Sequence, residues 1–211
     1  MLRARDLRVA CGLDWGTASP GVCVWGAAFP DGHVHIFDEL KFQRQTVKEV
    51  AEAIIAKHRH WQLKTPVPTF ADPSIKPWGT SSGAVGEAIG TTFTRYGVPL
   101  IYPSNDRVNG WQRLHEALAP CTHTDHPPRP WLSIHPRCRY GIRTLPLMVQ
   151  DENNPEDLDS ESDDHWCDAL RYLLMGGLRP ATARATPAPA ALYSPQWFRN
   201  RFSQKPKGVL A

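Results

Sequence analysis

Three strand-like segments open the chain with no helix between them, and this feature most constrains the fold. Residues 7–15, 21–29 and 33–42 are rich in apolar side chains, and Pro30-Asp31-Gly32 is a turn signal between the last two. Consecutive strands joined by such short turns pair as antiparallel neighbours. The sequence therefore predicts a three-stranded antiparallel meander at the start of the domain.

Strands and helices alternate after the meander. Thr46 and Glu49 have the spacing of a capping box, and apolar residues then recur at helical spacing through residue 58. We expect further strands at 69–73, 98–102 and 131–135, and further helices at 82–96, 105–118, 137–145 and 163–175. This alternation is typical of parallel strands. The predicted fold class is α/β, a mixed sheet whose three leading antiparallel strands are followed by parallel strands and flanked by helices.

Length and composition indicate one domain with a tail. The chain has 211 residues, 41% of them hydrophobic, which is enough for a core. Beyond Leu178 the sequence becomes rich in Pro and Ala and contains no acidic residue. We expect a folded domain over residues 1–178 and a basic Pro/Ala-rich tail over residues 179–211. The five cysteines are irregularly spaced, and neither a signal peptide nor a membrane-spanning run occurs, so we expect an intracellular protein with no membrane partner.

Three separated carboxylates are candidates for a metal site. Asp14 ends the first strand between two glycines, Asp72 ends the fourth strand before Pro73, and Asp168 lies in the last helix. Ligands of α/β sheets gather at the carboxyl ends of strands, and hard cations take carboxylate oxygens. Each acid alone also fits a turn or a solvated face. Their order along the chain favours a site for two metal ions that cleaves a phosphodiester.

The last helix adds two further candidates. Asp164 and Asp168 are four residues apart and His165 is three residues before Asp168, so all three share one helix face. Like charges four residues apart repel each other unless a cation neutralises them. The adjacent Asp163 leaves open which of the two neighbouring acids assists.

These segments resemble the nuclease domain of tailed-phage large terminase subunits, which drive DNA packaging and belong to the ribonuclease-H-like superfamily. The resemblance runs from about residue 8 to residue 177. It rests on Gly12-Leu13-Asp14-Trp15-Gly16, Ala71-Asp72-Pro73-Ser74, Asp106-Arg107-Val108-Asn109-Gly110-Trp111 and Asp164-His165-Trp166-Cys167-Asp168-Ala169-Leu170-Arg171-Tyr172.

The resemblance implies a ribonuclease-H-like fold and a metal-dependent endonuclease that cuts concatemeric viral DNA during genome packaging. Asp14, Asp72 and Asp168, with Asp164, would hold two Mg²⁺ or Mn²⁺ ions, and His165 would assist catalysis. Double-stranded DNA is the expected substrate. Candidate phosphate contacts are Arg44, Lys76, Arg95, Arg107 and Arg143.

The resemblance also implies partners and a setting. In a full motor these are an ATPase domain, a small terminase subunit and the portal or procapsid, in the host cytoplasm. The Gly-x-x-x-x-Gly-Lys-Ser/Thr loop of the ATPase half has no counterpart here. We therefore expect a monomeric nuclease domain that does not hydrolyse ATP by that route.

Two alternatives use some of the same residues. A Holliday-junction resolvase or transposase would share the chemistry but cut another substrate. A sugar-kinase or actin-like ATPase would use Gly12-Leu13-Asp14-Trp15-Gly16-Thr17 as a phosphate loop, although no second Asp-x-Gly-Thr follows. Cleavage of four-way junctions would favour the first alternative, and nucleotide binding would favour the second. A DNA-binding module without catalysis belongs to a third class, which metal-independent binding without cleavage would reveal.

Overall fold

The computed structural model describes residues 7–76, 88–121, 129–152, 154–159 and 162–178. The start of the helix predicted at 82–96 and the whole tail predicted at 179–211 lie outside these ranges. The division of the chain at residue 178 therefore stays a prediction.

A six-stranded mixed sheet forms the centre of the domain, and its order is β5-β4-β1-β2-β3-β8. The first three strands pair antiparallel, as the meander predicted. The remaining strands join in parallel, β4 on β1, β5 on β4 and β8 on β3. The bounds are β1 Arg8–Asp14, β2 Gly21–Ala28, β3 Val34–Phe42, β4 Thr69–Ala71, β5 Leu100–Ile101 and β8 Leu132–Ile134, with β6 Pro120–Cys121 and β7 Arg129–Pro130 as a separate pair.

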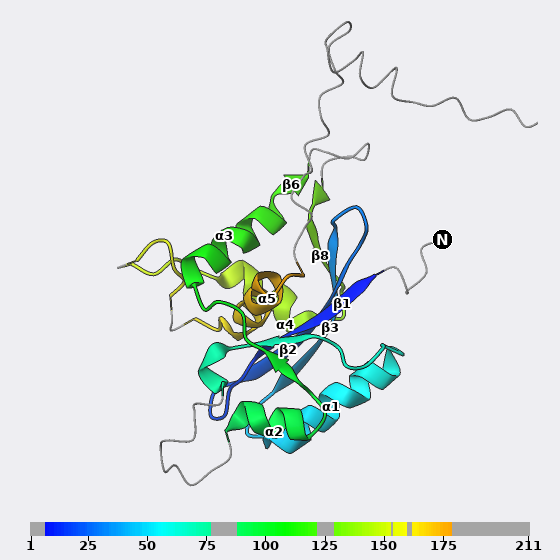
Figure 1. Ribbon diagram of the computed structural model, residues 1–211. Coiled ribbons are helices and arrows are strands. Elements are labelled where there is room, and N and C mark those ends of the chain that lie inside the picture. Colours follow the sequence, from blue (N-terminus) through cyan, green and yellow to red (C-terminus); the bar gives the residue numbers. More distant parts are fainter. Residues whose placement is uncertain (1–6, 77–87, 122–128, 153, 160–161, 179–211) are drawn as a thin grey trace, which may run out of the picture. The chain divides into compact units, whose positions relative to one another are not determined.

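Helices cover both faces of the sheet (Figure 1). On one face lie α1 Val47–His60 and α2 Ile89–Arg95, and on the other α3 Arg107–Leu118, α4 Arg139–Thr144 and α5 His165–Met175. Short 3₁₀ turns follow β4 at Pro73–Ile75 and α4 at Leu145–Leu147. The α/β mixed sheet predicted from the sequence is confirmed.

Alternation along β1 creates two cores. Cys11 and Leu13 point to the layer of α1, where they pack with Ile54, whereas Ala10 points to the layer of α5. All eight residues of β2 are buried because this central strand is covered from both sides. The four cysteines whose side chains are described are free and buried, and no described helix is long and apolar enough to cross a membrane.

Local side-chain chemistry sets where the helices begin. The capping box at α1 is confirmed, since Thr46 and Glu49 each accept a hydrogen bond from the other's backbone N–H. Helix α3 begins at Arg107, two residues later than predicted, because the Asp106 side chain accepts from the backbone N–H of Asn109. Helix α5 begins at His165 rather than at residue 163, because the Asp164 carbonyl accepts the first helical bond.

Helix α5 touches the backbone of β1 at Gly12. A Cβ atom at this position would lie 1.9 Å from the carbonyl oxygen of Ala169 and 2.9 Å from Cβ of Leu173. Only glycine allows this approach. Because Asp168 precedes Ala169 on α5 and Asp14 follows Gly12 by two residues, the same contact brings these two carboxylates toward one end of β1.

Replacing Gly12 by Ala is expected to destabilise the domain severely, by more than about 3 kcal/mol, because backbone must move. Gly26→Ala is the matched control. Its Cβ would meet the ends of two leucine side chains, Leu178 at 2.7 Å and Leu173 at 2.9 Å, which can turn away. Urea unfolding followed by circular dichroism measures both. Equal stabilities of the two variants would contradict the backbone contact.

Candidate active site

Asp14 is the last residue of β1 and is nearly enclosed. It keeps 9% of its surface exposed, and one oxygen, Oδ2, lies 3.1 Å from Nδ1 of His165 at the start of α5. The contact joins the first strand to the last helix, 151 residues apart. A carboxylate buried this far needs a hydrogen-bond or charge partner, and His165 is that partner.

Asp72 follows β4 and lies beside the end of β1. Its backbone N–H donates to the Leu13 carbonyl at 3.2 Å, which continues the parallel pairing of β4 with β1 by one residue. Its Oδ1 accepts from the N–H of Ser74 at 2.8 Å and caps the 3₁₀ turn. Parallel pairing thus places Asp72 and Asp14 at the same sheet edge.

Asp168 is buried in α5 and is held by two arginines. Its Oδ1 accepts from Nε of Arg171 at 2.7 Å and lies 2.6 Å from Nη2 of the same side chain. Its Oδ2 accepts from Nη1 of Arg107 at 3.2 Å. Arg171 was not expected as a partner of Asp168 from the sequence, although its position three residues later on the same helix was a usable signal.

The two acids that precede α5 face different surroundings. Asp164 is half-buried and its Oδ2 lies 3.4 Å from Nη2 of Arg107, so it belongs to the same cluster as Asp168. Asp163 is exposed and accepts a hydrogen bond from the Tyr140 hydroxyl instead. The geometry therefore separates two residues that the sequence could not distinguish.

The pKa values of these side chains reflect burial and the closeness of several carboxylates. Burial raises the pKa of Asp14, and the charges of Asp168 and Asp72 raise it further against the lowering effect of His165. Burial and the charge of Asp168 raise the pKa of Asp164 to about 6. The hydrogen bond to Asp14 raises the pKa of His165, against the effect of its own burial. Asp14, Asp72, Asp164 and Asp168 therefore form one electrostatically linked group, called here the carboxylate cluster.

Arg107 contacts acidic side chains, and its role as a phosphate contact stays a prediction. The sequence suggested that it contacts a phosphate, but its guanidinium contacts three acids, with Nε at 2.9 Å from Oδ1 of Asp157 and longer contacts to Asp164 and Asp168. These acids raise the pKa of Arg107 further above its ordinary value, although burial acts in the opposite direction. Opposite charge on the surrounding loop and helix draws Arg107 inward. The other four predicted phosphate contacts, Arg44, Lys76, Arg95 and Arg143, are exposed on separate elements.

The carboxylate cluster has the donor chemistry of a divalent-cation site, and each of its four carboxylates has at least one oxygen in contact with a protein group. Carboxylate oxygens are the ligands that Mg²⁺ and Mn²⁺ prefer. Among the described residues, no three acidic, histidine or cysteine side chains are arranged to hold a metal ion. Both oxygens of Asp168 contact arginines. The mutually repelling carboxylates fit a cation chemically, and Arg107 and Arg171 are the counter-charges that contact Asp168.

Comparison with solved structures finds the same fold in large terminases of phages. The nuclease domain of the P22 large terminase superposes with a TM-score of 0.62 at 14% identity, covering 83% of this chain and 84% of that one. No family model and no curated protein matches by sequence. The chain has the fold of phage large terminase nuclease domains.

Two further terminase nuclease structures share this fold. The large terminase of the thermophilic bacteriophage D6E matches with a TM-score of 0.60 at 17% identity, over 85% of this chain. This chain spans 42% of that protein. The nuclease domain of the bacteriophage SPP1 large terminase, solved with bound Mn, matches with a TM-score of 0.50 at 20% identity over 81% of this chain and 87% of that one. The terminase nuclease fold is thus reached by chains that share few residues.

Replacing Asp14 by Asn is expected to stabilise this terminase-like domain in EDTA at pH 8, by roughly 2–4 °C in melting temperature, the shift that about 1 kcal/mol produces in such a domain. The pKa of Asp14 is raised in the folded state, so the wild type loses stability relative to Asn as pH rises through that pKa. Well below the unfolded-state pKa of about 3.9, the carboxyl is protonated in both states and the difference should vanish.

Scanning calorimetry across this pH range measures the effect, with Asp31→Asn as control. Asp31 is an exposed acid in the β2–β3 turn, where Asn can keep the bond that Oδ1 accepts from the His33 N–H. A lower melting temperature for Asp14→Asn at pH 8 would show that ionised Asp14 is a net stabiliser.

Proposed function

We propose that this chain is a metal-dependent DNA endonuclease that cuts concatemeric viral DNA during genome packaging by two-metal phosphodiester hydrolysis. One observation carries the proposal. Within a terminase nuclease fold, Asp14 and Asp72 lie at two strand ends and Asp168 lies on a helix. Burial of Asp14 and repulsion by the charges of Asp168 and Asp72 raise the pKa of Asp14. Perturbed acids gathered at one sheet edge are typical of functional sites.

Asp14, Asp72, Asp168 and Asp164 would hold two Mg²⁺ or Mn²⁺ ions. When bound, such ions supply an activated water nucleophile and stabilise the leaving oxygen. Asp14 suits a shared position, because its pKa responds to the charges of both Asp72 and Asp168. Mn bound to the SPP1 nuclease domain supports a divalent ion as cofactor.

His165 is placed to orient a water or the leaving group. Its Nδ1 is engaged with Oδ2 of Asp14, which fixes the ring and leaves Nε2 for a proton donor or acceptor role. The negative charge of Asp14 also favours the protonated imidazole, which can donate to a leaving oxygen. His165 thus complements the carboxylates, which can only accept hydrogen bonds when ionised.

The substrate would be double-stranded DNA bound mainly through its phosphates. The exposed cations Arg44, Lys76, Arg95 and Arg143 are candidate contacts, and contacts of this kind bind without reading sequence. Because this chain matches less than half of the D6E large terminase, the whole motor is part of the proposal. Its partners would be an ATPase domain, a small terminase subunit and a portal or procapsid, in the host cytoplasm, with this domain itself a monomer of residues 1–178 followed by a basic tail.

The deciding experiment is cleavage of supercoiled plasmid in Mg²⁺, Mn²⁺ or EDTA. We expect cleavage with either metal, none in EDTA, and a loss of more than about 100-fold in Asp14→Ala and Asp168→Ala, since even second-shell partners of metal ligands contribute 10- to 100-fold. Folding of each variant is checked by circular dichroism. Wild-type rates in either alanine variant would exclude that residue as a ligand.

Two outcomes would redirect the proposal. Preference for four-way junctions over duplex would indicate a resolvase or transposase. Absence of cleavage together with nucleotide binding would favour the phosphate-loop ATPase that Gly12, Asp14 and Gly16 allow in sequence.

The two adjacent acids before α5 should differ in the same assay. Asp164→Asn is expected to reduce cleavage by about 10- to 100-fold, because Asp164 would help to hold the ions beside Asp168, with which it shares Arg107. Asp163→Asn is the matched control and should stay within about threefold, because Asp163 is exposed and pairs with Tyr140. The reverse order of effects would assign the assisting role to Asp163.

A further inference from the structure

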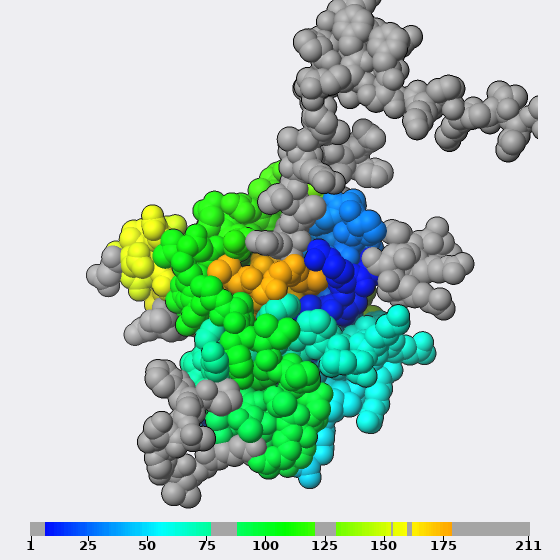
Figure 2. Space-filling model, viewed as in Figure 1, coloured from blue at the N-terminus to red at the C-terminus, as the bar shows by residue number. Residues whose placement is uncertain are grey.

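Two arginines hold Asp168, and they differ in accessibility. The side chain of Arg171 is fully buried, whereas that of Arg107 is 30% exposed. Figure 2 shows α5 in orange between the green surface of α3, which carries Arg107, and the dark blue surface of β1. Of the two counter-charges of Asp168, only Arg107 is exposed to solvent.

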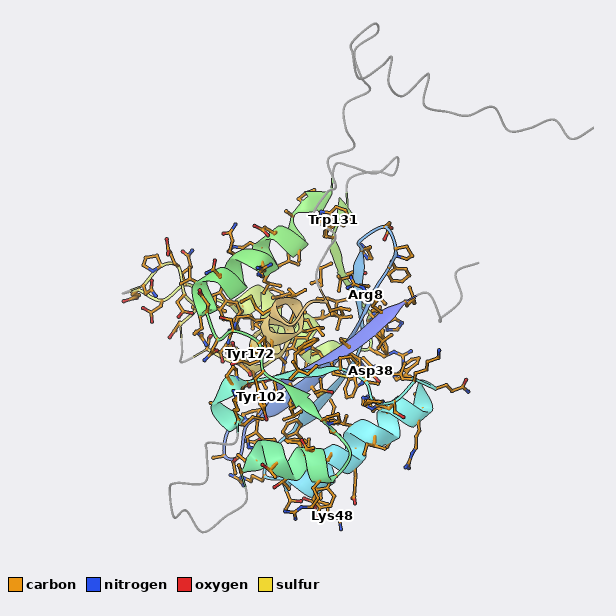
Figure 3. All side chains as sticks on the ribbon, viewed as in Figure 1. Arg8, Asp38, Lys48, Tyr102, Trp131 and Tyr172 are labelled. Atoms are coloured by element: carbon orange, nitrogen blue, oxygen red, sulfur yellow. The ribbon has the colours of Figure 1, made fainter. Side chains whose placement is uncertain are left out.

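Arg171 is fixed in the core. Its guanidinium lies over the rings of Trp111 at 5.2 Å and Tyr172 at 4.3 Å, and its Nη2 donates to Oδ1 of Asn105 at 3.3 Å. Tyr172, labelled in Figure 3, donates from its hydroxyl to the same Asn105 oxygen. Removing Arg171 would leave a buried carboxylate short of a partner, so this arginine is a permanent part of the fold.

Arg107 is held most closely outside the carboxylate cluster. Its Nε contacts both oxygens of Asp157 at 2.9 and 3.1 Å, while its contacts to Asp168 and Asp164 are longer, at 3.2 and 3.4 Å. Asp157 is itself fixed, because it accepts from Nε1 of Trp111 at 2.7 Å and from the Leu158 N–H at 2.8 Å. The guanidinium therefore has an anchor that does not depend on Asp164 or Asp168.

A divalent ion would compete directly with this guanidinium. Asp164 and Asp168 would both hold metal in the proposed site, and Arg107 contacts Oδ2 of each. Two cations this close repel each other strongly in a partly desolvated site. Arg107 can yield because its Nε contact with Asp157 keeps one ion pair when Nη1 and Nη2 are released.

We propose that Arg107 is the exchangeable counter-cation of the carboxylate cluster, which a divalent ion displaces from Asp164 and Asp168 while Asp157 retains it. The inference rests on the proposed metal-dependent function. Arg107 then sets the affinity of the site for metal and stabilises the metal-free protein. Arg171 is fully buried and is not displaced by the metal, so it does not exchange with it.

The test is Mn²⁺ binding by isothermal titration calorimetry, with melting temperatures in EDTA and in Mn²⁺. Arg107→Gln is expected to bind Mn²⁺ about tenfold more tightly than wild type, within the usual range of coupling between two ligands. It should also melt lower in EDTA and gain more from Mn²⁺ than the wild type does. Arg113→Gln, the same charge change on the same helix, should leave all three quantities unchanged.

High salt and a second variant distinguish an effect of direct Arg107 contacts on Mn²⁺ affinity from an effect of long-range charge repulsion. At about 1 M salt, where the Debye length is about 3 Å, a long-range effect disappears but a contact effect persists. Should Arg107→Gln fail to fold, Arg107→Lys keeps the charge without the forked geometry and should still bind Mn²⁺ more tightly than wild type, by less than tenfold. Unchanged or weaker Mn²⁺ binding by the folded Arg107 variant would overturn the inference while leaving the nuclease proposal intact.

Failure of the nuclease proposal gives a different pattern. If neither wild type nor Arg107→Gln binds Mn²⁺, both proposals fall. If only Arg107→Gln binds Mn²⁺, the counter-cation role holds. Arg107 then prevents the isolated wild-type chain from binding the metal.

Discussion

The contact between α5 and the backbone of β1 is the constraint on which the candidate site depends. Gly12 has no side chain, so the helix packs against the strand with the Ala169 carbonyl directly above it. That approach carries Asp168 and His165 to the end of β1, where His165 meets Asp14. A longer distance between these elements would leave the same acids on the same elements without joining them into one cluster. The site is therefore a consequence of how closely two backbones pack.

Charge neutralisation is the second requirement, since carboxylates are costly to bury without partners. The chain meets it with three cationic or ionisable side chains of different kinds, an enclosed Arg171, a half-exposed Arg107 and a histidine. The enclosed arginine belongs to the fold, as its stacking on Trp111 and Tyr172 shows. The other two are partly exposed to solvent. The stability of the domain and the charge balance of the carboxylate cluster thus depend on the same few contacts.

Local sequence patterns predicted the main strands, the helices and the cap at Thr46. They did not predict the side-chain contacts between residues far apart in the sequence. The meander, the capping box at Thr46 and the late helix follow from turn residues, side-chain caps and apolar spacing. The candidate acids followed from their positions at strand ends and on a helix face. The partner of Arg107 did not, because Asp157 lies 50 residues away in an irregular acidic loop with no periodicity. Helix α3 begins two residues later than expected because Asp106 caps it, and the spacing of apolar residues alone does not predict such a cap.

The closing of β1 by α5 also orders events during synthesis. Asp14 comes from the first strand and Asp168 from the last described helix, and the core formed by the meander stays open on one face until α5 packs there. Contacts of such long sequence separation form only after the intervening chain is made. An unfinished polypeptide therefore holds the acids without the cluster, and whatever chemistry the cluster performs begins only when translation has passed residue 175.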